Sequence, residues 1–208
     1  MKQTPVMRST LGRLPAYLQY LKGLNPEENE NVSATVIAKA LGLGDVQVRK
    51  DLNAVSGAGR PKLGYLTADL IKRLEEVLGH NSCKSAIIIG AGRLGNALLG
   101  YNGFAEYGLK VSAAFDSAPD KVGAIIGNKE VYPLSCLEDY CHREQVKIAV
   151  ITVPAEAAQE ICDRLVNCGI DAILNFAPCS LIVPENVILQ NENLALSLAH
   201  LKHQLENK

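Results

Sequence analysis

The sequence has no tryptophan, and it has three phenylalanines and four histidines in 208 residues. It also lacks an apolar run of roughly 18 residues, the length that a membrane-spanning helix requires. Its first ten residues, MKQTPVMRST, lack the apolar core of a signal peptide. We therefore expect a cytoplasmic protein with no membrane partner.

The cysteines are six in number and include no C-x-x-C pair, because their closest spacings are C-x4-C and C-x5-C. Such spacing is typical neither of a zinc site nor of a small secreted disulfide framework. Reduced, mostly buried thiols are the expectation. His200 and His203 stand one helical turn apart, but no third ligand accompanies them, so we predict no metal site.

The charge is unevenly distributed along the chain, although the net charge is only −1. Residues 1–84 contain 12 Lys and Arg against 8 Asp and Glu, whereas residues 85–208 contain 9 against 14. A basic first part joined to an acidic remainder suggests that only the first part meets a polyanion.

A strand–turn–helix pattern stands in the middle of the chain. The apolar run Ala86–Ile89 ends in the G-x-G-x-x-G sequence Gly90-Ala91-Gly92-Arg93-Leu94-Gly95, and a helical pattern follows. This is the context of a dinucleotide-binding loop. The first glycine permits a tight turn, the second lets the backbone approach a pyrophosphate, and the third lets the helix pack closely.

Asp116 ends a second predicted strand, Val111–Phe115, and lies 21 residues after Gly95. An acid at about this distance accepts a hydrogen bond from the ribose 2′-hydroxyl of NAD and repels the 2′-phosphate of NADP. The following residues, 117–120, offer no arginine to that phosphate. We therefore predict NADH and NAD+ as the ligands.

Two further predicted strands, Ile148–Val153 and Ile170–Leu174, complete an α/β pattern. They run into candidate cofactor contacts at the carboxyl edge of a doubly wound sheet: Thr152, Val153 and Pro154, and then Asn175, Phe176, Ala177 and Pro178. Asn175 is a candidate to bind a carboxamide and Phe176 to form an apolar wall beside a nicotinamide. Packing is an equally good explanation of both.

The first part predicts a helix-turn-helix. An amphipathic helix begins at Leu14, a second helix is capped by Ser33 with Val36 and Ile37 inward, and a third is capped by Asp45. The third helix carries polar and basic residues outside its apolar stripe. Such side chains read bases in a major groove, and the predicted DNA contacts on these helices are Ser33, Gln47, Arg49, Lys50 and Asn53.

A glycine-rich stretch, 57–65, follows that helix and carries Arg60 and Lys62. As a β-hairpin wing it would place both cations against phosphate or in the minor groove. Taken singly, the basic helix is more often a solvated face and the stretch a simple turn. Their order favours a winged helix that binds DNA. Thr67 is the predicted cap of the helix after the wing.

The predicted organisation is a winged-helix DNA-binding domain (1–80), a Rossmann-type doubly wound parallel sheet that binds NAD(H) (85–190) and a C-terminal helix (191–208). A short polar linker, His80–Lys84, separates the first two. In the last segment, leucines at spacings of four, three and four residues predict an apolar seam: Leu194, Leu198, Leu201 and Leu205.

The sequence resembles the Rex family of redox-sensing transcriptional repressors over essentially its whole length. The motifs that carry the resemblance are Arg13-Leu14-Pro15 with Tyr17, Gln47-Val48-Arg49-Lys50-Asp51-Leu52, Leu63-Gly64-Tyr65, the glycine loop, Thr152-Val153-Pro154-Ala155 and Leu174-Asn175-Phe176-Ala177-Pro178. The chain departs from the family pattern in 54–62, after the recognition helix, and at Asn193, where the family usually has Asp.

The resemblance implies a homodimer whose C-terminal helix is swapped onto the partner. It also implies that NADH and NAD+ compete for the Rossmann site, with NADH releasing double-stranded operator DNA. The alternative is a small NAD-dependent dehydrogenase. We disfavour an enzyme, because hydride transfer usually requires a His, Lys or Tyr near the ring and none of the four histidines ends a predicted strand. A metabolite-binding module would leave Arg49 and Lys50 without a role.

Overall fold

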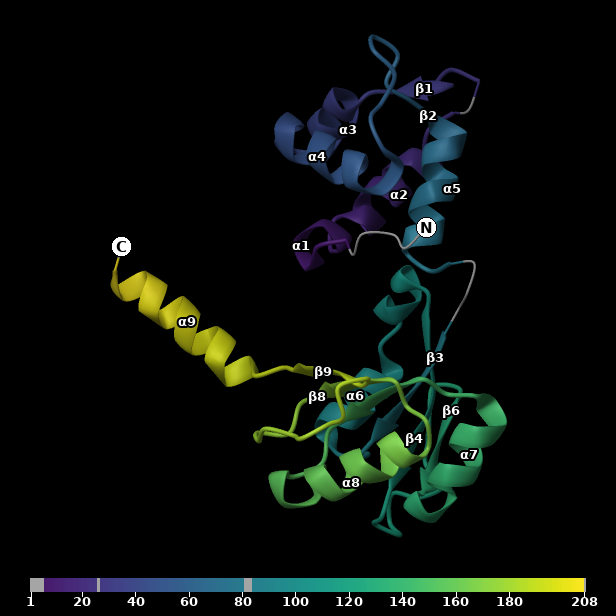
Figure 1. The fold of residues 1–208 in the computed structure, drawn as a ribbon, viewed down its shortest axis with the longest axis vertical. Helices are drawn as coiled ribbons and strands as arrows, with labels where there is room; N and C mark the ends of the chain where they lie inside the picture. Colours follow the sequence, from purple (N-terminus) through teal and green to yellow (C-terminus); the bar gives the residue numbers. More distant parts are fainter. Residues whose placement is uncertain (1–5, 26, 81–83, 208) are drawn as a thin grey trace. The chain divides into compact units, whose positions relative to one another are not determined.

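The computed structural model describes residues 6–25, 27–80 and 84–207. The chain divides into two compact units (Figure 1), which are Met1–Cys83 with Ala105–Gly108 and Lys84–Phe104 with Leu109–Lys208. Because 105–108 belongs to the first unit, the chain passes between the units three times. Most of the predicted linker, residues 81–83, lies outside the described residues.

The first unit packs helices around one apolar core and adds a two-stranded antiparallel sheet. The core includes the predicted stripe of Leu14, Tyr17, Leu18 and Leu21, all at most 4% exposed. The elements in chain order are α1 (Arg8–Leu11), α2 (Leu14–Lys22), β1 (Asn31–Val32), α3 (Ala34–Leu41), α4 (Asp45–Ser56), β2 (Tyr65–Leu66) and α5 (Thr67–Val77).

The helix-turn-helix is formed by α3 and α4, and only part of its predicted capping is correct. The Ser33 hydroxyl accepts a hydrogen bond from the N–H of Val36 and caps α3. The prediction for Asp45 is wrong, because Gly44 holds the N-cap position of α4. The prediction for Thr67 is also wrong, since it lies inside α5 and donates its hydroxyl to the carbonyl of Asn29. Val36, predicted to face inward, is exposed.

The wing is shorter than a regular hairpin. Arg60 and Gly64 exchange two backbone hydrogen bonds, of 2.7 and 2.9 Å, and form a single isolated bridge. Lys62 lies at the tip of this turn with φ of 65°. The residues after it form β2, which pairs with β1. The predicted hairpin is therefore a one-bridge loop that holds Arg60 and Lys62 close together.

Asp51 joins α4 to the N-terminal segment of the first unit. Its buried carboxylate accepts hydrogen bonds from the hydroxyls of Thr10 and Tyr17, both at 2.8 Å. The guanidinium of Arg13 binds both carboxylate oxygens, at 2.7 and 2.9 Å, and the amide of Gln47 lies 3.1 Å from one of them. A buried charge is tolerated only when it is paired and hydrogen-bonded, and this carboxylate meets both conditions.

The same contacts change the pKa values of Asp51 and Tyr17. Burial alone would raise the pKa of Asp51, but the donors Arg13, Tyr17 and Thr10 outweigh it and lower the pKa below its ordinary value. Burial and the hydrogen bond to Asp51 raise the pKa of Tyr17 to about 12. The ionised form of Asp51 therefore stabilises the fold above the unfolded aspartate pKa of about 3.9, and this stabilisation is lost as the pH falls through the lowered pKa.

The second unit is built on a seven-stranded sheet of order β5-β6-β4-β3-β7-β8-β9, in which every neighbouring pair is parallel except β5 and β6. The order reverses between β3 and β7, which is the switch point of a doubly wound fold. The strands are β3 (Lys84–Ile89), β4 (Leu109–Asp116), β5 (Ile125–Ile126), β6 (Lys129–Pro133), β7 (Ile148–Ile151), β8 (Ala172–Asn175) and β9 (Ile188–Asn191).

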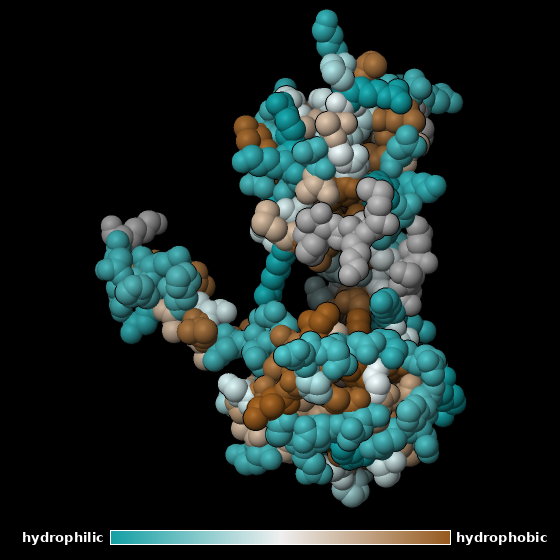
Figure 2. All heavy atoms as spheres, viewed as in Figure 1, coloured by the Kyte–Doolittle hydropathy of each residue, from teal (hydrophilic) through white to brown (hydrophobic). Residues whose placement is uncertain are grey.

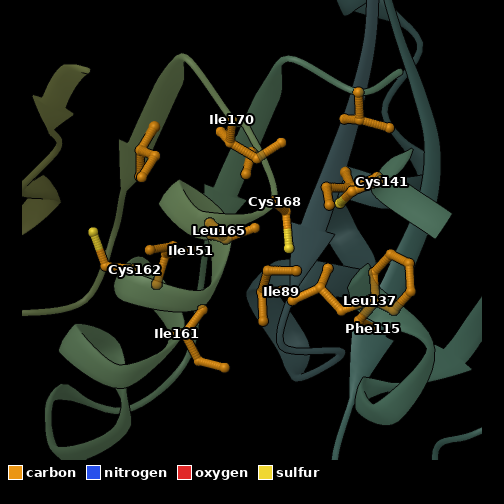
Figure 3. Packing of buried hydrophobic residues seen from close by; sticks show 14 of the residues in the cluster. Ile89, Phe115, Leu137, Cys141, Ile151, Ile161, Cys162, Leu165, Cys168 and Ile170 are labelled. Carbon is orange, nitrogen blue, oxygen red and sulfur yellow. The ribbon is translucent and has the colours of Figure 1, made fainter. Parts of the chain in front are cut away.

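Helices cover both faces of this sheet, as the two-residue period of a strand requires. Ile87 and Ile89 belong to the core under α7 and α8, whereas Ile88 belongs to the core on the other face, with Leu99 of α6. Figure 3 shows the first of these cores. In chain order the remaining helices are α6 (Arg93–Gly100), η1 (Gly103–Tyr107), most of which belongs to the first unit, η2 (Leu134–Cys136), α7 (Leu137–Glu144), α8 (Ala155–Asn167) and α9 (Leu194–Glu206).

The thiols follow the expectation in part. Cys141, Cys162 and Cys168 are buried between the sheet and its helices (Figure 3), and burial raises their pKa values, that of Cys141 to about 12. Cys136 is exposed, and Cys83 lies outside the described residues. Over the residues that the structure describes, no group of three or more His, Cys, Asp and Glu side chains is arranged to hold a metal ion.

The C-terminal helix α9 exposes its apolar side chains. Leu194, Leu198, Leu201 and Leu205 are 54–73% exposed, and Leu196 is 66% exposed. Figure 2 shows hydrophobic side chains at the surface of this helix. In the described part of the chain, no helix combines the length and the apolar character that a membrane crossing needs.

We expect Asp51→Asn to lower the free energy of unfolding of the first unit by about 2–3 kcal/mol at pH 7, because Arg13 loses its ionic partner inside the fold. Urea denaturation followed by circular dichroism measures this change. The difference from the wild type should shrink on acidification. The exposed Asp69→Asn serves as the control, and an equal loss in both variants would contradict the role given to Asp51.

Candidate functional site

A pocket of about 590 Å³ lies at the carboxyl edge of the sheet, where β3, β4 and β7 end. It lies at the switch point, where doubly wound folds bind ligands. Of the described residues that line it, only Asp116 and Lys121 have ionisable side chains. The lining consists of Ile89, Gly90, Gly92, Phe115, Asp116, Ser117, Ala118, Lys121, Leu134, Thr152, Val153, Pro154, Ala157 and Ile161.

The glycine loop owes its shape to close contacts within the protein. Gly90 has φ of 101°, and a Cβ there would lie 3.0 Å from the backbone of Thr152. A Cβ at Gly95 would overlap the carbonyl oxygen of Gly90. The Thr152 hydroxyl lies within hydrogen-bond distance of the carbonyls of Ile89 and Gly90, at 3.0 and 2.8 Å. Backbone conformation at Gly90 and close packing at Gly95 therefore favour glycine at the first and third positions of the loop.

Gly92 differs from the other two glycines of the loop. A Cβ at this position would meet no atom within 4 Å, its φ is −77°, and the residue lines the pocket as the N-cap of α6. Protein packing therefore does not require a glycine here. A bound phosphate approaching the N–H groups at the start of α6 would require one, so the loop fits a dinucleotide.

Asp116 is held by donors from three positions. Its carboxylate accepts the N–H of Ala91 at 2.7 Å and that of Ala118 at 2.8 Å, and the ammonium of Lys121 lies at 3.0 Å. Burial opposes ionisation, but Ala118, Lys121 and Ala91 outweigh it and lower the pKa of Asp116. The carboxylate is therefore ionised at neutral pH and available to accept a ribose hydroxyl.

Lys121 is a pocket residue that the sequence reading missed. It lies one position after residues 117–120, the segment in which the sequence offers no arginine. In the structure Lys121 lines the pocket and pairs with Asp116. The pocket therefore contains the positive charge of Lys121 close to Asp116, the residue expected to repel a 2′-phosphate. The ion pair with Asp116 neutralises the charge of Lys121.

A second hollow of about 370 Å³ is lined by four further predicted contacts. Three of the four residues predicted after β8, Phe176, Ala177 and Pro178, line it together with Leu94 from the glycine loop. The other residues around it are Cys179, Ser180, Asn191, Glu192, Asn193 and Leu194. Asn193 also caps α9, because its side-chain oxygen accepts the N–H of Leu196 at 2.9 Å.

The side chain of Asn175 is engaged within the protein, as the packing explanation expects. Its side chain is fully buried, and its oxygen accepts the N–H of Ala177. Its amide group donates to the carbonyls of Ala177 and Cys179 and to the side chain of Asn191. These hydrogen bonds shape the turn after β8, and the residues that they link to Asn175 line the second hollow. Ala91, Arg93 and Gly95 line neither hollow.

The predicted DNA-contact residues on α4 have different surroundings. Arg49, Lys50 and Asn53 are exposed on this helix. Arg49 pairs with Asp45 at 2.7 Å, and the amide of Gln47 points to the buried Asp51. Ser33 serves as the cap of α3 and is partly exposed. The exposed cations Arg60 and Lys62 follow on the wing. One unit thus presents a basic helix and a basic loop.

The fold and the two hollows define a class: a DNA-binding helix-turn-helix protein that also contains a Rossmann nucleotide site. Family models agree with both halves. The model described as "Putative DNA-binding protein N-terminus" matches residues 6–53, and the model described as "CoA binding domain" matches residues 81–179.

Full-length relatives identify the family. Redox-sensing transcriptional repressor Rex of Treponema denticola is 42% identical over 207 residues, which are 100% of this chain and 99% of the relative. The Rex protein of Porphyromonas gingivalis strain W83 is 40% identical and covers 98% of this chain and 94% of its own. The chain belongs to the Rex family of redox-sensing transcriptional repressors, which confirms the resemblance seen in its motifs.

Solved structures support the same fold. The Rex-family repressor RSP in complex with beta-NAD+ and operator DNA gives a TM-score of 0.82 at 35% identity, covering 98% of this chain and 94% of RSP. RSP in complex with beta-NADH gives 0.74 at the same identity, covering 98% and 96%. The predicted fold class is therefore confirmed, except for the swapped position of α9. The relatives do not favour the dehydrogenase alternative.

Two variants separate the folding role of the loop from its ligand role. Gly95→Ala should lower the free energy of unfolding by about 3 kcal/mol or more, because its Cβ has no space beside Gly90. Gly92→Ala should unfold like the wild type but bind NADH at least tenfold more weakly, because its Cβ projects toward the pyrophosphate. Thermal unfolding and calorimetric NADH titration measure both changes. Unaltered NADH binding by Gly92→Ala would refute its place in the ligand site.

Asp116 and Lys121 permit a test of cofactor choice. Asp116→Ala should weaken NADH binding about tenfold, since a charge-assisted hydrogen bond is lost, and should strengthen NADPH binding, since Lys121 is left unpaired to meet the 2′-phosphate. Adding Lys121→Ala to Asp116→Ala should abolish the stronger binding of NADPH, and it should not restore the binding of NADH. Calorimetry with both nucleotides measures the effect, and an unaltered preference in Asp116→Ala would exclude the ribose role.

Proposed function

We propose that this protein is a redox-sensing repressor that binds double-stranded operator DNA as a homodimer and is released by NADH. The observation that carries the proposal is the joint presence, in one chain similar to Rex repressors over its full length, of a basic helix-turn-helix and a glycine-loop pocket. A protein that acts on the chromosome of a bacterium works in the cytoplasm, so the proposal includes that location.

The DNA contacts come from α4 and the wing. Arg49 and Lys50, with Asn53 one turn further, face away from the core that Val48 and Leu52 enter. Arginine and lysine bind guanine, and asparagine binds adenine, in the major groove. Arg60 and Lys62 on the wing contact phosphate or the minor groove. Ser33 supports this surface as a helix cap.

The nucleotide is an effector and not a substrate. Gly90, Gly92 and the start of α6 hold the pyrophosphate, and Asp116 holds the ribose of the adenosine. Phe176 with Ala177 and Pro178 forms the apolar wall for the nicotinamide. Reduction makes this ring uncharged, so an apolar wall distinguishes NADH from NAD+. The pocket's own ionisable groups, Asp116 and Lys121, are engaged with each other, and neither is a free acid or base for hydride transfer.

The homodimer is supported by the exposed leucines of α9. A helix with five leucines between 54 and 73% exposed buries little apolar surface in one chain, and exposed apolar surface of this kind marks an interaction site. A second copy of the chain is the partner that the family implies. Two copies also give two recognition helices, which suits a palindromic operator.

Fluorescence anisotropy tests the function. The probe is a palindromic duplex enriched from a randomised library by the wild type with NAD+, alongside a scrambled duplex. NADH should release the enriched duplex, whereas NAD+ should permit binding. Since regulation requires that the ligands bind two states unequally, equal effects of NADH and NAD+ would exclude redox sensing.

The paired variant Arg49→Ala with Lys50→Ala tests the DNA surface. Two base contacts of about 1–3 kcal/mol each are lost, so affinity for the enriched duplex should fall on the order of 100-fold, while calorimetric NADH binding stays as in the wild type. Lys72→Ala, on the exposed side of α5, is the matched loss of one cation. Undiminished duplex binding by the paired variant would show that α4 is not the recognition helix.

A further inference from the structure

Asp45 places a negative charge on the helix expected to enter the major groove. It is the first residue of α4, one helical turn before Arg49. A carboxylate on this surface repels the phosphates of DNA and lowers affinity for any sequence. Its presence therefore calls for an explanation in terms of the side chains that it contacts.

Helix capping does not provide this explanation. Gly44 holds the N-cap position of α4, and no side chain caps the helix there. Stability explains its presence only in part, because an acid in the first turn gains modestly from the helix dipole and an exposed pair of charges spaced i,i+4 contributes little. The side chains of Arg49 and Asp45 are 63% and 38% exposed. Both oxygens of Asp45 are instead committed to side chains.

The carboxylate of Asp45 links two helices through a chain of three side chains. Its Oδ1 accepts the hydroxyl of Thr35, in the first turn of α3, at 2.7 Å. Its Oδ2 accepts Nη2 of Arg49 at 2.7 Å. Because Thr35 fixes the carboxylate and the carboxylate fixes the guanidinium, Arg49 is held in one arrangement. Lys50 beside it has no such partner among the contacts of the described residues.

We propose that Asp45 is a positioning residue that sets the DNA specificity of this protein by orienting Arg49. A guanidinium has five N–H donors in a rigid fork. With one donor on Asp45, the others are free to bind O6 and N7 of a guanine in one orientation. Less rotamer freedom is then lost on binding. The carboxylate also penalises sequences that leave Arg49 without a guanine, since phosphate repulsion is then uncompensated.

The inference rests on the proposed role of α4 as the recognition helix. It predicts that Asp45 lowers the affinity for DNA in general and raises the selectivity for the operator sequence. Removing the charge of Asp45 should strengthen binding to a scrambled duplex and reduce the preference for the enriched duplex. A purely structural role predicts weaker binding to both duplexes.

The test compares Asp45→Asn, Thr35→Val and Glu76→Gln in the full chain with NAD+, using anisotropy on the enriched and the scrambled duplex. Asp45→Asn should lower the ratio of the affinity for the enriched duplex to that for the scrambled duplex about tenfold. This is toward the lower end of the discrimination that a bidentate base contact provides. Thr35→Val keeps the charge, so the ratio should fall without a gain on the scrambled duplex. Glu76→Gln removes an equal charge from the Arg73–Glu76 pair of α5 and should leave the ratio unchanged.

The Arg49→Ala background decides whether Asp45 acts through the arginine. There Asp45→Asn should leave the ratio unchanged, because no guanidinium remains to be positioned. The proposal is overturned if Asp45→Asn keeps the wild-type ratio, or if its loss of ratio persists without Arg49. If Arg49→Ala itself binds the enriched duplex like the wild type, the recognition role of α4 fails as well. If Arg49→Ala weakens binding to the enriched duplex but Asp45→Asn keeps the wild-type ratio, the positioning role of Asp45 is excluded and the recognition role of α4 is retained.

Discussion

The close approach of α6 to the end of β3 is the constraint on which the nucleotide site depends. Only a hydrogen atom fits where the side chain of Gly95 would stand, next to the carbonyl of Gly90. Thr152 closes the other side of the loop with its hydroxyl. The N–H of Ala91 is then directed to Asp116. Three strands thus fix the loop before any ligand arrives, and a preorganised site loses less entropy on binding.

The parts of this arrangement that were predictable from the sequence are those encoded by local periodicity. A β-branched run, three glycines at fixed spacing and an acid at the end of the next strand give the loop and Asp116. The alternation of Ile87, Ile88 and Ile89 between two cores follows from the period of a strand. The sequence does not predict the short strands β5, β6 and β9, because two to five residues carry too little periodicity.

The parts that were not predictable depend on contacts between distant segments. Asp51 occupies a buried position of α4 that the apolar periodicity does not distinguish. Its donors Thr10, Arg13 and Tyr17 lie 34 to 41 positions earlier in the chain. Asn175 stands where a ligand contact is common, yet its hydrogen bonds are all internal. An acid at a helix start resembles a cap, and Asp45 was misread for this reason.

The two aspartates of α4 illustrate how burial decides what a carboxylate does. Asp51 is 1% exposed and surrounded by donors, so its charge fixes the helix to the body of the unit. Asp45 is half-exposed and contacts Thr35 and Arg49, and in the proposal above its charge orients Arg49. A recognition helix needs both functions, because base reading requires a rigid helix and oriented side chains.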